Sequence, residues 1–264
     1  MKILAFGTLK GGTGKTTVAY NIGGILAEEK KVLFIDMDPQ SNLSDNAGID
    51  TTDQDGATIR DVFNNPTRVK ASDVITKAPM WQIPNLDIIA SHIRLTQTEL
   101  QLVATVGRER IIQKWIARNR AELEQYDYII IDTNPSMGIV NQNAFMTADS
   151  IILVSAVSKK SIQGAQLFSY LWGEICEQMD VEEKIHALIL NDCDKRIGLT
   201  QNIIEYYQDD EDFGKILLEN TIPSRVDIKR TETEYLPINF TAPNSDSCEA
   251  FRAVVNELRN REVL

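Results

Sequence analysis

Two lysines stand among glycines and threonines near the start of this sequence, in the stretch Lys10-Gly11-Gly12-Thr13-Gly14-Lys15-Thr16-Thr17. Glycines allow consecutive backbone N–H groups to point inward at an anion, and the amino end of a following helix adds a partial positive charge. In such a loop Lys15 would contact the β- and γ-phosphates of a nucleotide, and Thr16 would offer its hydroxyl to Mg²⁺. The stretch therefore predicts a phosphate-binding loop.

The segments on either side of this stretch fit that prediction. Residues 3–6 are an apolar run typical of a short buried strand, and apolar residues recur at helical spacing over residues 18–26. A phosphate-binding loop requires this order of strand, glycine-rich turn and helix. The alternative is a glycine-rich turn that binds nothing, but it does not explain two lysines at this spacing between a strand and a helix.

Aspartates follow two further apolar runs. A β-branched run ends in the segment DMDPQ, residues 36–40, and three isoleucines at residues 129–131 precede Asp132. Such an isoleucine run predicts a strand covered on both faces, at the centre of a parallel sheet. Because α/β sheets bind their ligands at the carboxyl ends of strands, Asp38 and Asp132 are candidate site residues. Asp36 is expected to have a structural role, and the alternative role for Asp38 is to cap the helix that follows.

The glycine-rich stretch resembles the deviant Walker A loop of the ParA/MinD ATPases. Leu9 stands where the plain pattern G-x-x-x-x-G-K-[ST] has its first glycine, and Lys10 precedes the glycines instead. The D-x-D-P-Q segment resembles the family's switch I, and Asp132 matches its Walker B carboxylate. The resemblance implies ATP and Mg²⁺ as cofactors, with Asp38 positioning the attacking water and the metal. It also implies that Asp132 holds Mg²⁺ through a coordinated water.

The resemblance assigns a role to Lys10, and the sequence departs from the family pattern at one position after Asp132. In the family a lysine like Lys10 reaches across a nucleotide-sandwich dimer to the partner's phosphates, so ATP would control dimerisation. Lys10, Lys15 and Asp38 are then the expected catalytic residues for hydrolysis of the β–γ bond. The family pattern D-x-P-P-S begins here at Asp132 and continues with Thr, Asn, Pro and Ser, so Asn134 replaces the first proline.

Two later segments correspond to the family's adenine site. Asn191 ends an apolar run and matches an asparagine that reads adenine, the alternative being an ordinary turn residue at a strand end. Residues 216–222 are expected to form a strand that ends at Pro223, whose backbone would flank the adenine. Basic residues near these strand ends would contact DNA, or would be solvated side chains beside the adenine pocket. They are Lys195, Arg196, Arg225, Lys229 and Arg230.

The composition excludes several classes of protein. With 38 acidic and 27 basic side chains the net charge is −11, which excludes a uniformly basic surface for nucleic acid but allows a local patch. No apolar stretch approaches the ~20 residues of a membrane span. Three scattered cysteines and two histidines form no metal-binding or disulfide motif. The N-terminus enters the first strand directly, so neither a signal peptide nor an added DNA-binding domain is expected. The predicted location is cytoplasmic, and the family resemblance implies association with the nucleoid.

Strands that alternate with helices predict an α/β fold with a doubly wound, mostly parallel sheet. Residues 1–264 are expected to form a single P-loop ATPase domain. Residues 96–124 are expected to be helical, with a break or a kink at Gly107. The resemblance implies a DNA-partition ATPase that forms a homodimer on ATP and binds DNA without sequence preference. A centromere-binding, ParB-type partner would release it by stimulating hydrolysis.

Other functions of proteins with this loop are the alternatives. A MinD-like membrane-positioning ATPase would need a membrane-targeting tail. The apolar stripe of residues 247–261 is short and its charges are balanced, so a core-facing helix explains it and no membrane partner is expected. A nitrogenase-reductase-like electron donor would need cysteines within residues 132–145, and a tyrosine kinase would need tyrosines within residues 236–264. The sequence has neither.

Overall fold

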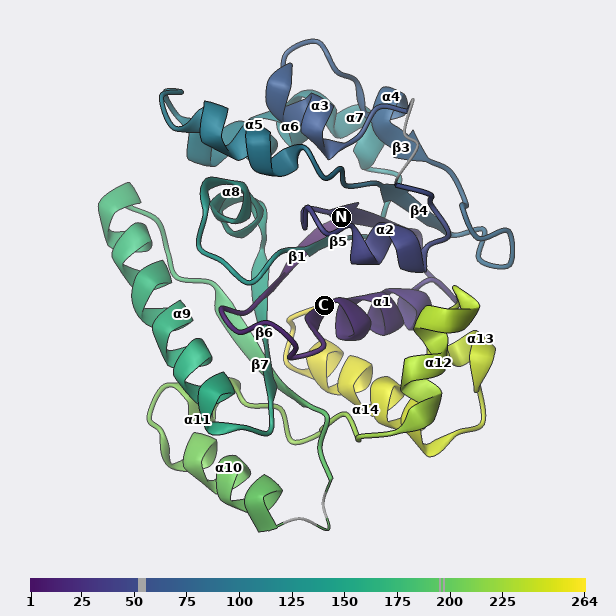
Figure 1. Ribbon diagram of the computed structural model, residues 1–264, viewed down its shortest axis with the longest axis vertical. Helices are drawn as coiled ribbons and strands as arrows, with labels where there is room; N and C mark the ends of the chain where they lie inside the picture. Colours follow the sequence, from purple (N-terminus) through teal and green to yellow (C-terminus); the bar gives the residue numbers. More distant parts are fainter. Residues whose placement is uncertain (52–55, 195, 197) are drawn as a thin grey trace.

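The computed structural model describes residues 1–51, 56–194, 196 and 198–264 (Figure 1). In this part of the chain seven strands form one sheet in the order β3-β4-β2-β5-β1-β6-β7. The strands are β1 (Lys2–Gly7), β2 (Val32–Asp36), β3 (Ile75–Thr76), β4 (Leu86–Ile89), β5 (Tyr128–Asp132), β6 (Ser150–Ala156) and β7 (Ile185–Asn191). β3 pairs antiparallel with β4, and the other neighbouring strands pair in parallel. The prediction of a mostly parallel sheet is confirmed.

The register of the central strands aligns the strand ends that carry candidate residues. β5 lies between β1 and β2, and Asp132 stands opposite both Phe6 of β1 and Asp36 of β2. Because these strands are parallel, the segments that follow them emerge at the same edge of the sheet. The fold thus brings the glycine-rich loop, the segment after Asp36 and Asp132 to one place.

Helices cover both faces of the sheet, as the doubly wound prediction requires (Figure 1). One layer contains α1 (Lys15–Leu26), α2 (Asn42–Asn46), α12 (Val226–Glu234), α13 (Ile238–Thr241) and α14 (Asp246–Asn260). The opposite layer contains α3 (Ile59–Asn64), α4 (Ala71–Val74), α5 (Leu95–Leu102), η1 (Arg108–Arg110), α6 (Ile111–Arg118), α7 (Arg120–Leu123), α8 (Ile139–Thr147), α9 (Lys159–Met179), α10 (Gly198–Asp209) and α11 (Phe213–Ile216).

Side chains along β5 alternate between these two layers. Ile129 and Ile131 pack in the core that includes α8 and α9, whereas Ile130 packs in the core that includes α1. All three are fully buried, which confirms the predicted central strand. Burying one isoleucine side chain contributes about 2 kcal/mol, so Asp132 ends a strongly anchored strand.

The helix predicted over residues 96–124 is divided into shorter helices. Gly107 has a φ of +68° and precedes η1, which confirms the predicted break at this residue. A second break lies at Asn119, between α6 and α7. Its side chain accepts a hydrogen bond from the Ala71 backbone N–H and donates one to the Trp115 carbonyl, both at 2.9 Å. This tie between distant segments explains a break that helical periodicity does not reveal.

The strand predicted over residues 216–222 is wrong. α11 ends at Ile216, and the segment that follows forms isolated bridges, with Leu188 of β7 and with Cys193 just after β7, rather than a continuous ladder. Between these bridges the Glu257 carboxylate of α14 accepts hydrogen bonds from the backbone N–H groups of Glu219 and Asn220, at 2.8 and 2.9 Å. These two amides therefore cannot donate to a neighbouring strand.

The apolar side of α14 faces the protein interior. Phe251, Val254 and Val255 are at most 1% exposed and pack in the same core as α1. This confirms the prediction of a core-facing closing helix. None of the described helices is long and apolar enough to cross a membrane.

Candidate active site

The glycine-rich loop joins β1 to α1 and lines a cavity of about 440 Å³. Gly12 and Gly14 have φ angles of +78° and +77°, a conformation that glycine adopts without the steric cost of a side chain. Lys15 begins α1, so the cavity lies at the amino end of a 12-residue helix, where backbone N–H groups and the helix dipole favour anions. The whole predicted stretch lines this cavity, namely Lys10, Gly11, Gly12, Thr13, Gly14, Lys15, Thr16 and Thr17.

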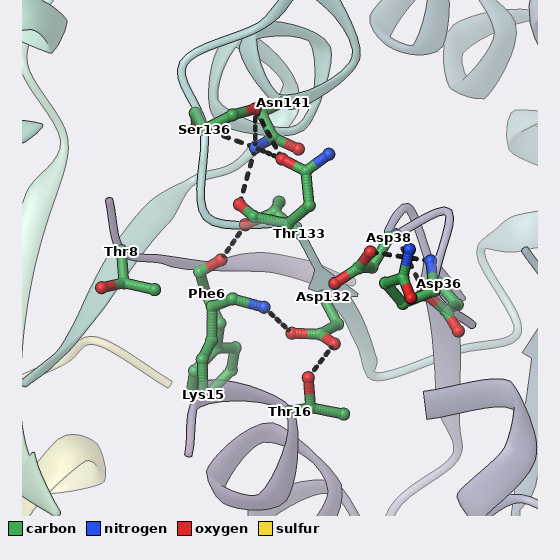
Figure 2. Close-up of polar contacts among 12 residues, drawn as sticks. Phe6, Thr8, Lys15, Thr16, Asp36, Asp38, Asp132, Thr133, Ser136 and Asn141 are labelled. Atoms are coloured by element: carbon green, nitrogen blue, oxygen red, sulfur yellow. Dashed lines mark hydrogen bonds and ion pairs between the residues drawn. The ribbon is translucent and has the colours of Figure 1, made fainter. Parts of the chain in front are cut away.

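The Asp132 carboxylate contacts two side chains at the start of α1 (Figure 2). Lys15 Nζ lies 2.5 Å from Oδ1, and the Thr16 hydroxyl donates a 2.6 Å hydrogen bond to Oδ2. Lys15 is 6% exposed and Asp132 is fully buried, and a buried ammonium is stable only beside such a partner. The structure therefore brings together three residues that the sequence assigned to phosphate and metal binding.

Asp36 holds the segment after β2 in place. Its carboxylate accepts hydrogen bonds from the Ser44 backbone N–H (2.8 Å), the Ser44 hydroxyl (2.7 Å) and the Asp38 backbone N–H (3.0 Å). Burial raises the pKa of Asp36 to about 7, and the nearby Asp132 charge acts in the same direction. These contacts agree with the structural role expected for Asp36.

Asp38 lines the same cavity as the glycine-rich loop. Its carboxylate accepts a 2.9 Å hydrogen bond from the Gln40 backbone N–H, and burial raises its pKa. α2 begins at Asn42 with Ser41 at the position before it, so the alternative role of Asp38 as a cap for this helix is wrong. The role of Asp38 toward water and metal stays a prediction.

Lys10 differs from Lys15 in its surroundings. Its side chain is exposed at the rim of the cavity, and no carboxylate forms an ion pair with it in the part of the chain that the structure describes. The loop lies close to Gly164 of α9 at this point. If Gly164 carried a side chain, its Cβ would lie only 3.0 Å from the Cβ of Lys10. Lys10 is therefore held by its backbone while its ammonium extends into solvent.

A second cavity, of about 470 Å³, adjoins the first on the side of β7. Asn191 and Pro223 line it, together with the basic residues Arg225 and Lys229. The Asn191 amide donates a 2.8 Å hydrogen bond to the carbonyl of Thr13, so it contacts the glycine-rich loop directly. The structure thus places both predicted adenine residues beside the loop, and their contact with a base stays a prediction.

The predicted DNA-binding residues fall into different environments. Arg196 pairs with Asp194, at 2.9 Å to Oδ1 and 2.7 Å to Oδ2, and Arg230 pairs with Glu234 one helical turn away at 2.7 Å. Arg225 and Lys229 have no carboxylate partner among the described residues. Lys195 lies outside the described residues. Carboxylates therefore compensate Arg196 and Arg230 but not Arg225 and Lys229, and contact of these residues with DNA stays a prediction.

Asn134, which replaces a family proline, belongs to a network that the sequence analysis missed, together with Ser136 and Asn141, which Figure 2 labels. Its side-chain oxygen accepts hydrogen bonds from the Ser136 hydroxyl (2.5 Å) and from the Asn141 amide (2.7 Å). Asn141 also donates to the Asn134 and Ser136 carbonyls, both at 2.8 Å. In the family pattern a proline at this position would restrict the backbone of the turn after Asp132. In this chain the hydrogen bonds of Asn134, Ser136 and Asn141 hold that turn instead.

Glu232 of α12 was also missed. It lines both cavities and accepts a 2.8 Å hydrogen bond from the Thr17 hydroxyl. The sequence gives no signal for it, because it is one of several charged residues in an exposed helix and lies 215 positions from Thr17.

Comparisons with known proteins agree with this geometry. A family model described as an AAA domain matches residues 1–187. The chain is 29% identical to the sporulation initiation inhibitor protein Soj of Bacillus subtilis, over 97% of this chain and 98% of Soj. A plasmid partition protein of Borrelia burgdorferi has a similar fold, with a TM-score of 0.74, 21% identity and 98% of each chain covered.

An enzyme with different chemistry shares the same fold. Cobyrinic acid a,c-diamide synthase of Mycobacterium smegmatis, solved with an ATP analogue and magnesium, matches with a TM-score of 0.81 and 21% identity. The match covers 99% of this chain and 96% of the synthase. At this identity the likeness concerns the fold alone.

Proposed function

This chain belongs to the ParA-type family of deviant Walker A ATPases, and we propose that it is a DNA-partition ATPase driven by an ATP-dependent dimer. The dimer would bind DNA without sequence preference and would dissociate when a ParB-type partner stimulates hydrolysis. The observation that carries the proposal is the contact of Asp132 with both Lys15 and Thr16, two residues that line the loop cavity.

Hydrolysis of ATP would use the residues around this cavity. Lys15 and the backbone N–H groups of the loop would bind the β- and γ-phosphates and oppose the charge that develops in the transition state. The Asp38 carboxylate lines the same cavity and would orient the attacking water by accepting its hydrogen bond. Asp36 would keep Asp38 in position through the hydrogen bond to its backbone N–H.

The oxygen donors of this site suit Mg²⁺. The Thr16 hydroxyl and the Asp132 carboxylate lie 2.6 Å apart, and Asp38 lines the same cavity. Mg²⁺ usually takes one or two protein carboxylates and completes its shell with phosphates and water. In agreement, the described residues contain no cluster of three or more acidic, histidine or cysteine side chains that could hold a metal alone. When bound, Mg²⁺ would neutralise charge on the phosphate oxygens.

Lys10 would act on the phosphates of a second copy of this chain. Its exposed ammonium can reach a partner, whereas Lys15 is 6% exposed and paired within its own chain. The Lys10 ammonium of one copy would contact the ATP phosphates of the other copy, so that dimerisation would depend on bound ATP. An arginine finger acts in a similar way, because a second protein supplies the cation that contacts the phosphates.

DNA binding would depend on Arg225 and Lys229, the predicted basic residues at the second cavity. With a net charge of −11 the protein as a whole repels DNA, so binding requires a local patch that dimerisation doubles. Four such contacts in a dimer would contribute about −3.6 to the slope of log affinity against log salt, at about −0.9 for each phosphate contact.

The test compares DNA binding with ATP, with ADP and without nucleotide, and compares DNA with anionic liposomes under the same conditions. We expect ATP-dependent binding to DNA of unrelated sequences and none to liposomes. Binding to liposomes in place of DNA would support the membrane-positioning alternative instead. The matched variants are Arg225→Gln with Lys229→Gln, and Arg196→Gln as the control, because Arg196 is already paired with Asp194.

The double variant should lose DNA binding while ATP affinity and ATP-dependent dimerisation stay near wild type. The contrary result would be a double variant that binds ATP more weakly but binds DNA as well as wild type when both proteins are equally saturated with nucleotide. That result would assign Arg225 and Lys229 to the adenine pocket. That result would contradict the proposed DNA contacts.

A further inference from the structure

We propose that Glu232 binds the ribose hydroxyls of the nucleotide and makes the site selective for ribonucleoside over deoxyribonucleoside triphosphates. The inference rests on the proposed ATP binding and adds a specificity-determining residue to it. Glu232 lies on α12, outside the glycine-rich loop and the segments after β2 and β5.

The position of Glu232 between the two cavities suggests this role. The loop cavity and the second cavity share Gly12, Gly14 and Thr17 of the glycine-rich loop, and Glu232 of α12. In a nucleotide the ribose joins the phosphates to the base. A nucleotide with its phosphates in the loop cavity and its base beside Asn191 must therefore place its ribose at the boundary that these residues form.

The free hydrogen-bonding capacity of Glu232 fits a sugar. One carboxylate oxygen accepts the 2.8 Å hydrogen bond from the Thr17 hydroxyl. In the part of the chain that the structure describes, no lysine or arginine pairs with Glu232 and no donor contacts its second oxygen. A carboxylate accepts several hydrogen bonds and donates none, and the 2′- and 3′-hydroxyls of a ribose are two adjacent donors.

Charge also favours a sugar over a phosphate at this position. A carboxylate that faced the triphosphate would repel it, and no lysine or arginine among those described forms an ion pair with Glu232. The ribose is neutral and donates its hydroxyl protons, so it can lie against the carboxylate without this cost. Thr17 fixes the carboxylate by its hydrogen bond and thereby orients the second oxygen.

The test measures the dissociation constants of ATP, 2′-deoxy-ATP and 3′-deoxy-ATP by calorimetry for wild type, Glu232→Ala and Glu232→Gln. Glu234→Gln is the matched control, because Glu234 is on the same helix but lines neither of these two cavities. Wild type should bind ATP at least about tenfold more tightly than one deoxy analogue, the factor expected for a lost hydrogen bond to a charged group. Glu232→Ala should bring the three constants within about twofold, while Glu234→Gln keeps the wild-type ratio.

Several results would overturn the inference. One is wild-type protein that binds ATP and both deoxy analogues equally. Another is Glu232→Ala that keeps the wild-type ratio or weakens all three nucleotides by the same factor, which would leave Glu232 as a structural tie to Thr17. If Glu232→Ala does not fold, Glu232→Gln decides, because it removes the charge and keeps the shape. Folded wild-type protein that binds none of the three nucleotides would instead refute the proposed ATP binding itself.

Discussion

Replacing Asp132 by asparagine should lower the free energy of unfolding of the nucleotide-free protein by about 3 kcal/mol. Lys15 is 6% exposed, its Nζ lies 2.5 Å from the carboxylate, and Asp132 is fully buried. Removing one partner of a buried ion pair costs about 3–5 kcal/mol, because the other charge stays buried without compensation. The lower end of this range applies here. The Asp132 charge disfavours the ionised forms of Asp36 and Asp38, so removing it relieves that repulsion and offsets part of the cost.

A double-mutant cycle isolates this pair from its surroundings. Lys15→Met alone should also destabilise the protein, because it leaves the buried Asp132 carboxylate with the Thr16 hydroxyl as its remaining side-chain partner among the described contacts. The double variant should cost less than the sum of the two single variants, by about 2 kcal/mol. Lys10→Met is the matched control, because it removes a lysine from the same loop at an exposed position, and it should change stability by less than about 0.5 kcal/mol.

The assay is equilibrium unfolding in urea at constant pH, without nucleotide or magnesium, with the slope of each transition compared among variants. Single-variant effects that add within about 0.5 kcal/mol would show that Lys15 and Asp132 do not stabilise each other. That outcome would refute the stabilising ion pair of Lys15 with Asp132, and it would weaken the observation on which the proposed function rests.

Two further predictions concern the reaction and the dimer. Asp38→Ala should keep ATP affinity and ATP-dependent dimerisation but lower single-turnover hydrolysis by about 100-fold or more, the contribution of a positioned group in proton transfer, and turnover at the wild-type rate would remove Asp38 from the mechanism. Lys10→Ala should change the ATP affinity of the monomer by less than about threefold, since its ammonium is exposed and the Lys15 contact is intact. Sedimentation velocity with ATP should then show monomers, and an undiminished dimer would return Lys10 to an ordinary loop role.

The sequence was most informative where a local pattern determines structure by itself. The glycines at 12 and 14 adopt the positive φ angles that the loop requires, and the isoleucines before Asp132 form a strand buried on both faces. Lys15 and Asp38 follow the ends of their strands, and Asp132 is the last residue of β5. Because parallel strands end at one edge of the sheet, the strand assignments alone predict that these residues lie close together.

The parts that the sequence did not predict depend on contacts between distant segments. Residues 216–222 have the composition of a strand, but the Glu257 side chain, 37 positions or more away, takes two of the amides that a ladder would need. β3 has two residues, too few for an alternating pattern to be detected. Asn134 could be identified as a departure from the family pattern, but its partner Asn141 could not be inferred before the turn and α8 were known.

The charges of α12 show why a basic run does not by itself predict a binding surface. Residues three or four positions apart lie on the same side of a helix, so each charge can be assigned to a face once the helix bounds are known. Lys229 and Glu232, three apart, both line the second cavity, whereas Arg230 and Glu234, four apart, form an ion pair away from it. The ion pair with Glu234 thus neutralises the charge of Arg230, and the charged side chains of α12 that line the second cavity are one lysine and one glutamate. A sum of charges along the chain treats these residues alike, although their positions on the helix assign them to different interactions.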